Sequence, residues 1–181
     1  ALMEDQGCVV ALDNHLEKLL ILQEACRRLG VRVVHNMTAD AARPLGCLKP
    51  HSFHGILVDA PCSGLGVLSK HPDGKTGRRE QDVYRLADLQ LRMLRGAAPL
   101  LRPGGRILYV TCAISREENE GVVSAFLKQN PQMRLRDLGP FTPDLAKGLI
   151  TGEGFLKTLP HVHRMDGFFA ALFVNPGLFP N

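Results

Sequence analysis

The sequence of 181 residues predicts an α/β fold in which a mostly parallel sheet carries helices on both faces. Short segments that are almost entirely apolar alternate along the chain with segments whose apolar residues recur at helical spacing. Strands that are apolar throughout are typical of a sheet that is covered on both faces. Acidic residues close two of these strands, at Asp13 and Asp59, and in such sheets ligands bind beyond the carboxyl ends of the strands.

The first predicted elements are a strand at residues 7–13 (GCVVALD) and a helix with Leu19, Leu22, Cys26 and Leu29 on one face, which Gly30 ends. Further strands are predicted at residues 31–36, 55–59, 106–111 and 168–174. A helix is predicted from Asp82 to about Leu94, with a kinked continuation past Pro99. Ser115 and Glu118 have the spacing of a capping box, which predicts a helix from Ser115 to about Lys128. The length suits one domain, so residues 1–181 are predicted to form a single domain.

Composition narrows the functional classes. The net charge of +4 and the pI of about 8.9 allow a polyanionic partner. The sequence has neither an apolar run long enough to span a membrane nor a secretory leader pattern, so a cytoplasmic protein without a membrane partner is predicted. Its five cysteines are scattered without CxxC spacing, which favours reduced thiols and argues against a zinc or other metal site.

The residues that end strands are the candidates for chemistry. A carboxylate at Asp13 can accept hydrogen bonds from the two hydroxyls of a ribose, and Asp40 is either a neighbour of an adenine or a turn residue. Residues 64–66 (GLG) lack the third glycine of a dinucleotide fingerprint, and residues 61–65 (PCSGL) lack the first glycine of a serine nucleophile elbow. Neither a nicotinamide enzyme nor an α/β hydrolase is therefore supported.

Two cysteines follow strands that share this edge of the sheet. Cys62 comes three residues after Asp59, and Cys112 comes directly after Thr111. A single cysteine at either place would be read as a packing residue, but two thiols and a carboxylate on one edge favour a reactive site. The loop at residues 70–79 has a local charge of about +3 and is either a solvated surface loop or a contact for phosphates; its basic residues are Lys70, Lys75, Arg78 and Arg79.

These motifs together resemble the Sun/RsmB family of S-adenosylmethionine-dependent RNA cytosine-5 methyltransferases. The segments that carry the resemblance are residues 59–73 (DAPCSGLGVLSKHPD), 102–123 (RPGGRILYVTCAISREENEGVV) and 166–173 (DGFFAALF). The resemblance implies a Rossmann-like class I methyltransferase fold, S-adenosylmethionine as cofactor, and an RNA substrate, either rRNA or tRNA. Ala113 departs from the serine that is usual in the family after the second cysteine.

The resemblance also assigns roles to individual residues. Cys112 corresponds to the nucleophile, Cys62 to the cysteine that assists breakdown of the covalent adduct, and Asp59 to the acid that holds the cytosine ring near N3. Asp13 is assigned to the cofactor ribose and Asp40 to the region of its adenine, with Asp59 also on the cofactor side. The basic loop at residues 70–79 would then contact RNA phosphates.

One part of the family pattern, a strand followed by a glycine-rich cofactor loop, is expected before Ala1. The chain is therefore predicted to be the C-terminal part of a catalytic domain, and to bind S-adenosylmethionine weakly or not at all by itself. Three alternatives stay open: a non-catalytic RNA-binding domain of the same fold, a methyltransferase acting on an exocyclic amine, and a thiol redox pair formed by Cys62 and Cys112. The redox pair requires the Cα atoms of these cysteines to lie within about 7 Å of each other.

Overall fold

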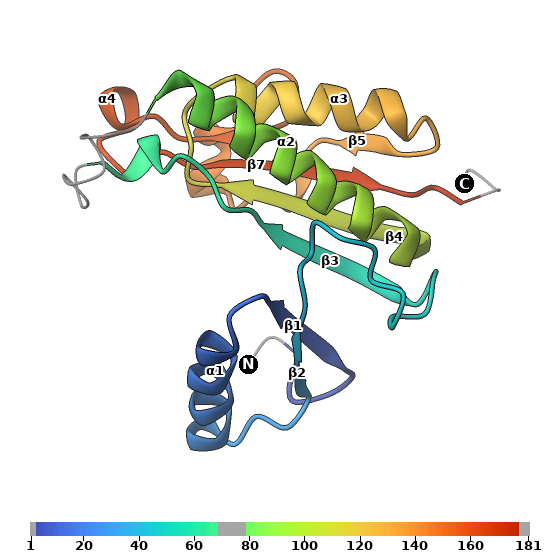
Figure 1. Cartoon of the computed structure of the whole chain (residues 1–181). Helices are drawn as coiled ribbons and strands as arrows, with labels where there is room; N and C mark the ends of the chain where they lie inside the picture. Colours follow the sequence, from blue (N-terminus) through green and yellow to red (C-terminus); the bar gives the residue numbers. More distant parts are fainter. Residues whose placement is uncertain (1–2, 69–78, 178–181) are drawn as a thin grey trace. The chain divides into compact units, whose positions relative to one another are not determined.

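The structure is a computed structural model that describes residues 3–68 and 79–177, and it divides the chain into two compact units, residues 1–47 and 48–181 (Figure 1). The first unit contains β1 (Val9–Asp13), α1 (Leu16–Leu29) and β2 (Val34–Thr38). The two strands pair in parallel from Val9 beside Val34 to Asp13 beside Thr38. Gly30 ends α1 in the left-handed conformation (φ 69°), where a glycine has no steric penalty, so the predicted stop is confirmed.

The second unit contains a five-stranded sheet in the order β3-β4-β7-β5, with β6 also pairing with β7. Its strands are β3 (Phe53–Asp59), β4 (Leu101–Thr111), β5 (Arg134–Arg136), β6 (Leu156–Lys157) and β7 (Phe169–Val174). The pair β3–β4 is parallel, as predicted, but β7 runs antiparallel to each of its three partners. The short connection from β6 to β7 explains part of this mixed topology, because a parallel pair needs a crossover of a dozen or more residues.

Helices α2 (Glu80–Ala97) and α3 (Val122–Gln129) lie beside each other on one face of this sheet, and the short α4 (Pro160–His163) precedes β7 (Figure 1). The predicted continuation of α2 past Pro99 is a 3-10 turn, Ala98–Leu100. The helix predicted from Ser115 begins later than expected: a π-turn at Glu117–Gly121 comes first and α3 follows it. Leu57 of β3 keeps 65% of its surface exposed.

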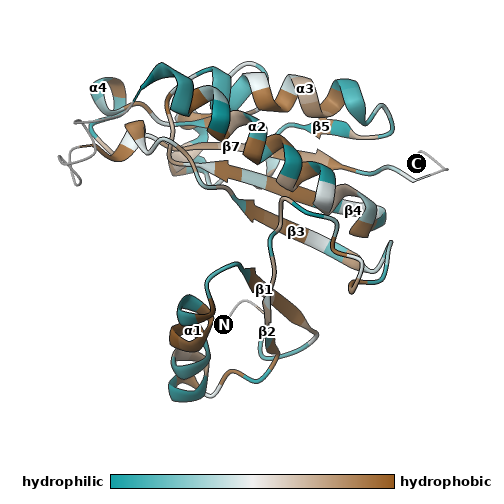
Figure 2. Cartoon of the chain, viewed as in Figure 1, coloured by the Kyte–Doolittle hydropathy of each residue, from teal (hydrophilic) through white to brown (hydrophobic). Residues whose placement is uncertain are grey.

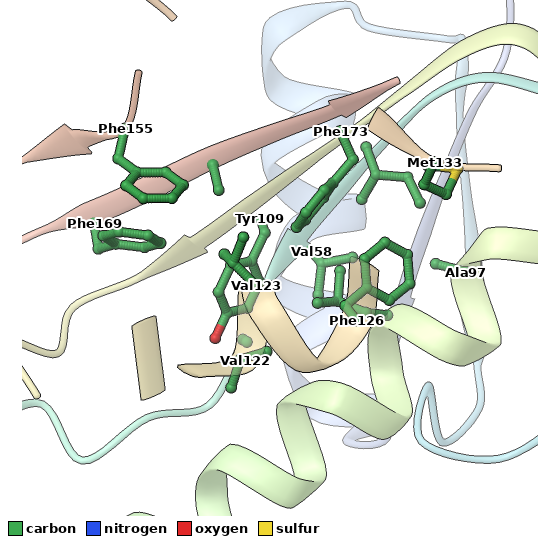
Figure 3. Close-up of a cluster of buried hydrophobic side chains, with 14 of the residues drawn as sticks. Val58, Ala97, Tyr109, Val122, Val123, Phe126, Met133, Phe155, Phe169 and Phe173 are labelled. Atoms are coloured by element: carbon green, nitrogen blue, oxygen red, sulfur yellow. The ribbon is translucent and has the colours of Figure 1, made fainter. Parts of the chain in front are cut away.

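The core of the second unit lies between the sheet and these two helices. Tyr109, Phe126, Phe169 and Phe173 are fully buried, and the rings of Phe126 and Phe173 meet edge to face with centroids 4.8 Å apart (Figure 3). Figure 2 shows β4 and β7 largely in the colours of apolar residues, whereas α2 alternates between apolar and polar surface. This packing fixes the carboxyl ends of β3 and β4, from which the candidate site is built.

No helix in the described residues is long and apolar enough to cross a membrane. Within residues 3–68 and 79–177, no group of three or more histidine, cysteine, aspartate or glutamate side chains is arranged to hold a metal ion.

Candidate active site

Two parallel strands end side by side at the site. In the register of β3 and β4, Asp59 lies opposite Val110, and the next residue, Ala60, donates its N–H to the carbonyl of Val110 at 3.0 Å. The loop that carries Cys62 therefore leaves the sheet beside the segment that carries Cys112. The side chain of Asp59 is exposed at this edge.

The two predicted cysteines are in direct contact. Their Sγ atoms are 2.9 Å apart although the residues are separated by fifty positions in sequence, and the backbone N–H of Cys112 points to Cys62 Sγ at 3.3 Å. Both are free thiols, and both are partly buried. The sequence prediction that these two residues share one cleft agrees with this arrangement.

The surroundings of Cys62 change its affinity for a proton. Burial, and in addition the contact with Cys112, raises the pKa of Cys62 to about 12, because a thiolate in a poorly solvated position is unfavourable. At neutral pH Cys62 therefore keeps its hydrogen, and either sulfur can be the donor in the contact between them.

Gly66 joins the loop of Cys62 to the rest of the site through backbone contacts. Its N–H donates to the carbonyl of Cys112 at 3.0 Å, and its own carbonyl accepts from the N–H of Gly167 at 2.7 Å. A Cβ atom at position 66 would lie 2.1 Å from the carbonyl oxygen of Gly167, so only glycine allows this close approach. The three segments that carry the family resemblance thus meet at Gly66.

A hollow of about 450 Å³ opens beside Cys62, between its loop and the first turns of α2. Its wall includes Cys62, Ser63 and Leu65 on one side and Arg79, Arg85 and Leu86 on the other. Glu80 and Asp82 also line the hollow, so its wall combines apolar side chains with charges of both signs next to a thiol.

Three buried polar residues border the two cysteines, and a sequence motif predicts a role for only one of them. Glu118 was predicted to cap a helix; the structure instead places its carboxylate against Ser115 Oγ and the backbone N–H of Ser63. Gln90 and Asn119 have no role in the motifs that the sequence presents. Gln90 has a signal in the sequence, since it interrupts the apolar face of α2 formed by Val83, Ala87, Leu94 and Ala97.

The two acidic residues assigned to the cofactor belong to the first unit. Asp13 ends β1, and its carboxylate accepts from the N–H of His15 at 2.8 Å and pairs with Lys18 Nζ at 3.3 Å. The His15 hydrogen bond is the main cause that lowers the pKa of Asp13, so the carboxylate is ionised at neutral pH. Asp40 has the contacts of a turn residue: its carboxylate accepts from the N–H of Ala42 at 2.9 Å and pairs with Arg43 Nε at 3.2 Å.

Most of the predicted RNA-binding loop, including Lys70, Lys75 and Arg78, lies outside the described residues. Arg79 is described: it is exposed directly before α2, and its N–H donates to Asp82 Oδ2 at 3.0 Å.

Comparison with known proteins places these features in context. A family model described as 16S rRNA methyltransferase RsmB/F matches residues 1–174. The chain is 40% identical over 176 residues to a probable ribosomal RNA small subunit methyltransferase B of Bacillus subtilis, covering 93% of this chain and 38% of that protein. It is 36% identical to ribosomal RNA small subunit methyltransferase F of Serratia proteamaculans, covering 94% of this chain and 36% of that protein. The chain therefore spans less than two fifths of the length of these relatives.

Solved structures agree with the sequence comparison. The crystal structure of NSun6 from Pyrococcus horikoshii with SFG superposes with a TM-score of 0.77 at 29% identity, covering 97% of this chain and 43% of that one. A methyltransferase homolog protein, also from Pyrococcus horikoshii, gives a TM-score of 0.73 at 28% identity over 95% of this chain and 54% of that one. The predicted class I methyltransferase fold is confirmed.

Proposed function

Because this chain belongs to the family of the 16S rRNA methyltransferases RsmB/F, we propose that it provides the catalytic cleft for methyl transfer from S-adenosylmethionine to C5 of a cytosine in RNA. The observation that carries the proposal is the contact of the Cys62 and Cys112 sulfurs, 2.9 Å apart, beside the strand that ends in Asp59. A carbon-methylating site needs a nucleophile, a group that activates the ring, and a group that assists release of the product. The cleft offers one residue for each of these tasks.

The chemistry explains why a thiol is needed. C5 of cytosine is a poor nucleophile, but addition of the Cys112 thiolate to C6 converts the ring into an enamine whose C5 attacks the methyl group of the sulfonium donor. S-adenosylhomocysteine leaves with the electron pair of the broken S–CH₃ bond. Loss of the C5 proton to a base then restores the double bond and expels Cys112, which regenerates the free thiolate.

The raised pKa of Cys62 supports this division of roles. Because Cys62 keeps its hydrogen at neutral pH, it is poorly suited to attack C6, and Cys112 is the better nucleophile. The contact between the two sulfurs supports a role for Cys62 in moving protons when the adduct breaks down. The exposed carboxylate of Asp59 is available to hydrogen-bond the cytosine ring near N3.

The residues of the first unit fit part of a cofactor site. The Asp13 carboxylate is held by a backbone N–H and by Lys18, yet each of its oxygens retains a lone pair with which it can accept from a ribose hydroxyl. When bound, S-adenosylmethionine supplies the electrophilic methyl group. We assign Asp13 to its ribose and Asp40, with its side chain in a turn, to the neighbourhood of its adenine.

RNA is the proposed partner, and the basic loop with Arg79 at its end is its proposed phosphate contact. A target cytosine must leave its stack to enter a cleft at a sheet edge.

Trapping of the covalent intermediate tests the proposal. In the full-length enzyme, Cys112→Ala should abolish the covalent complex with RNA that contains 5-fluorocytosine, whereas Cys62→Ala should make an adduct accumulate on ordinary RNA. Cys8→Ala, at an exposed cysteine in the first unit, serves as the matched control. The opposite pattern would exchange the two roles, and absence of any adduct with the unaltered enzyme would favour a non-catalytic RNA-binding domain.

Product analysis by mass spectrometry provides the second test. We expect the methyl group on C5 of cytosine; a methyl group on the exocyclic nitrogen would overturn the proposal, because that chemistry requires no cysteine nucleophile.

A further inference from the structure

The turn that precedes α3 has an unusual form. Residues Glu117–Gly121 make a π-turn, closed by the N–H of Gly121 donating to the carbonyl of Arg116 at 2.8 Å. π-turns within helices are frequent at functional sites. Two consecutive side chains on this turn, Glu118 and Asn119, are fully buried, whereas their neighbour Glu117 is exposed.

Glu118 contacts the loop of Cys62 directly. Its Oε1 accepts from the backbone N–H of Ser63 at 2.7 Å, the residue after Cys62. The same oxygen accepts from Gln90 Nε2 at 3.1 Å, and that amide also donates to the carbonyl of Pro61 at 3.0 Å, the residue before Cys62. Both peptide neighbours of Cys62 are therefore held by one small network centred on a carboxylate.

Tyr109, on β4, contacts two members of this network. Its hydroxyl lies 2.9 Å from Gln90 Oε1 and 2.6 Å from the carbonyl oxygen of Glu118. Burial, and next the charge of Glu118, raises the pKa of Tyr109, so the hydroxyl stays protonated and remains a donor. In Figure 3 the ring of Tyr109 lies in the apolar cluster, with its oxygen toward the side of Val122, the first residue after the turn.

Asn119 contacts the segment of Cys112 in the same manner. Its Oδ1 accepts from Thr111 Oγ1 at 2.7 Å, and its Nδ2 donates to the carbonyl of Ala113 at 3.0 Å. Thr111 and Ala113 are the two neighbours of Cys112 in the chain. An amide side chain suits this place because one donor and one acceptor are required.

A buried carboxylate is costly unless it is fully hydrogen-bonded, so a residue of this kind persists where its contacts serve a purpose. Glu118 contacts Ser63, which is directly adjacent to Cys62, and Asn119 contacts Thr111 and Ala113 on both sides of Cys112. We propose that Glu118 and Asn119 are positioning residues, Glu118 for Cys62 and Asn119 for Cys112, and that the single turn carrying both sets the placement of the two sulfurs. The roles of the cysteines in this statement rest on the proposed function.

Thiol reactivity tests the positioning independently of methylation. Because the two sulfurs touch, each thiol is followed in the full-length protein with the other replaced by serine, and alkylation by iodoacetamide under native conditions is read by peptide mass spectrometry. Glu118→Ala should raise the alkylation rate of Cys62 about tenfold, since the loop loses the hydrogen bond at Ser63, and Gln90, which holds Pro61, loses one of its acceptors. Asn119→Ala should raise the rate at Cys112 by about the same factor.

Each variant should change the alkylation rate of the other cysteine by less than about twofold. Glu117→Ala should change the alkylation rate of both cysteines by less than about twofold. Equal acceleration of both thiols by either variant, together with a lower melting temperature, would mean that the turn has only a structural role and would overturn the proposal.

Covalent adducts with RNA provide the functional readout. Glu118→Ala should make adduct accumulate on ordinary RNA, as Cys62→Ala does, whereas Asn119→Ala should slow adduct formation with 5-fluorocytosine RNA. Glu118→Gln should behave nearly as the unaltered enzyme, because the glutamine keeps Oε1 for Ser63 and Gln90 and its amide donates to Ser115 Oγ. Asn119→Asp should slow adduct formation as Asn119→Ala does, because the aspartate faces the carbonyl of Ala113 with a second acceptor.

The two readouts separate the possible failures. Selective alkylation without any RNA adduct would retain the positioning residues and remove the proposed function. Adduct formation by the unaltered enzyme with unselective alkylation in the variants would retain the function and remove the positioning residues.

Discussion

Replacing Gly66 with alanine is expected to loosen the whole cleft, because this residue touches both other segments of the site. A methyl group there would lie 2.1 Å from the carbonyl oxygen of Gly167 and 2.7 Å from that of Cys112. Both obstacles are backbone atoms, so neither can rotate away as a side chain does. The first contact alone must open by about 1.3 Å to reach the 3.4 Å at which ordinary contact begins.

The size of the effect follows from what this movement breaks. Two backbone hydrogen bonds, from Gly66 to Cys112 and from Gly167 to Gly66, each contribute about 1 kcal/mol. Overpacking in a well-packed region adds about 1–3 kcal/mol. We therefore expect Gly66→Ala to lower the free energy of unfolding by about 3–5 kcal/mol, a large part of the stability of a typical domain.

Urea denaturation followed by circular dichroism measures this free energy. Gly148→Ala is the matched control, since a Cβ there meets no atom within 4 Å, and it should change the free energy of unfolding by less than about 0.5 kcal/mol. If Gly66→Ala proved no more destabilising than this control, the close approach of the three segments would be refuted. The same variant should also slow adduct formation at Cys112, since it displaces the carbonyl of that residue.

Three further outcomes are expected. At about pH 8 the raised pKa of Cys62 lowers its thiolate fraction about a thousandfold, and the greater nucleophilicity of that thiolate offsets the loss about twentyfold. Alkylation of Cys62 should therefore be about fiftyfold slower than alkylation of an ordinary thiol, and its rate should rise steadily from pH 7 to 10. An early plateau in the rate would contradict the raised pKa. Hydrogen peroxide should join Cys62 and Cys112 in a disulfide, because two thiols and one peroxide give one disulfide and two waters. The intact mass should fall by two hydrogens, and dithiothreitol should reverse the change. A stable sulfinic acid at Cys112 would argue against the short contact between the sulfurs. Hydrogen exchange of the backbone amides of Leu57 and Asp59 should be at least about a hundredfold faster than that of Val58, because alternation along β3 directs only the amide of Val58 toward β4. Equal protection of the three amides would mean that the edge of β3 away from β4 is already paired.

Local patterns in the sequence were enough to predict the elements that carry the chemistry. The periodicity before Gly30 predicts α1 to within a few residues, because the helix ends where the left-handed glycine lets the chain turn away. The apolar runs that end at Asp59 and Thr111 predict β3 and β4, and parallel pairing brings the segments after them to one edge. The contact between Cys62 and Cys112 follows from that pairing, and the family resemblance adds the role of each sulfur.

The supports of the site could not be predicted in this way, because they depend on contacts between distant segments. Ser115 and Glu118 match a capping box, but the carboxylate of Glu118 is used across the fold by Ser63 and Gln90, and the turn widens into a π-turn. The antiparallel direction of β7 also depends on contacts between distant segments. Its apolar sequence specifies a buried strand but carries no information about direction, which the short connection from β6 helps to set.

The arrangement separates the groups that react from the groups that hold them. Cys62 and Cys112 stand on two different loops, each of which leaves a different strand, and loops of this kind are ordinarily the most mobile parts of a fold. Glu118 and Asn119 are consecutive, so a displacement of their turn moves both contacts together and tends to preserve the distance between the sulfurs. Insertion or deletion of one residue in Glu117–Gly121 would change the direction of the buried side chains relative to their partners, and should therefore disrupt both cysteines at once even though neither is altered.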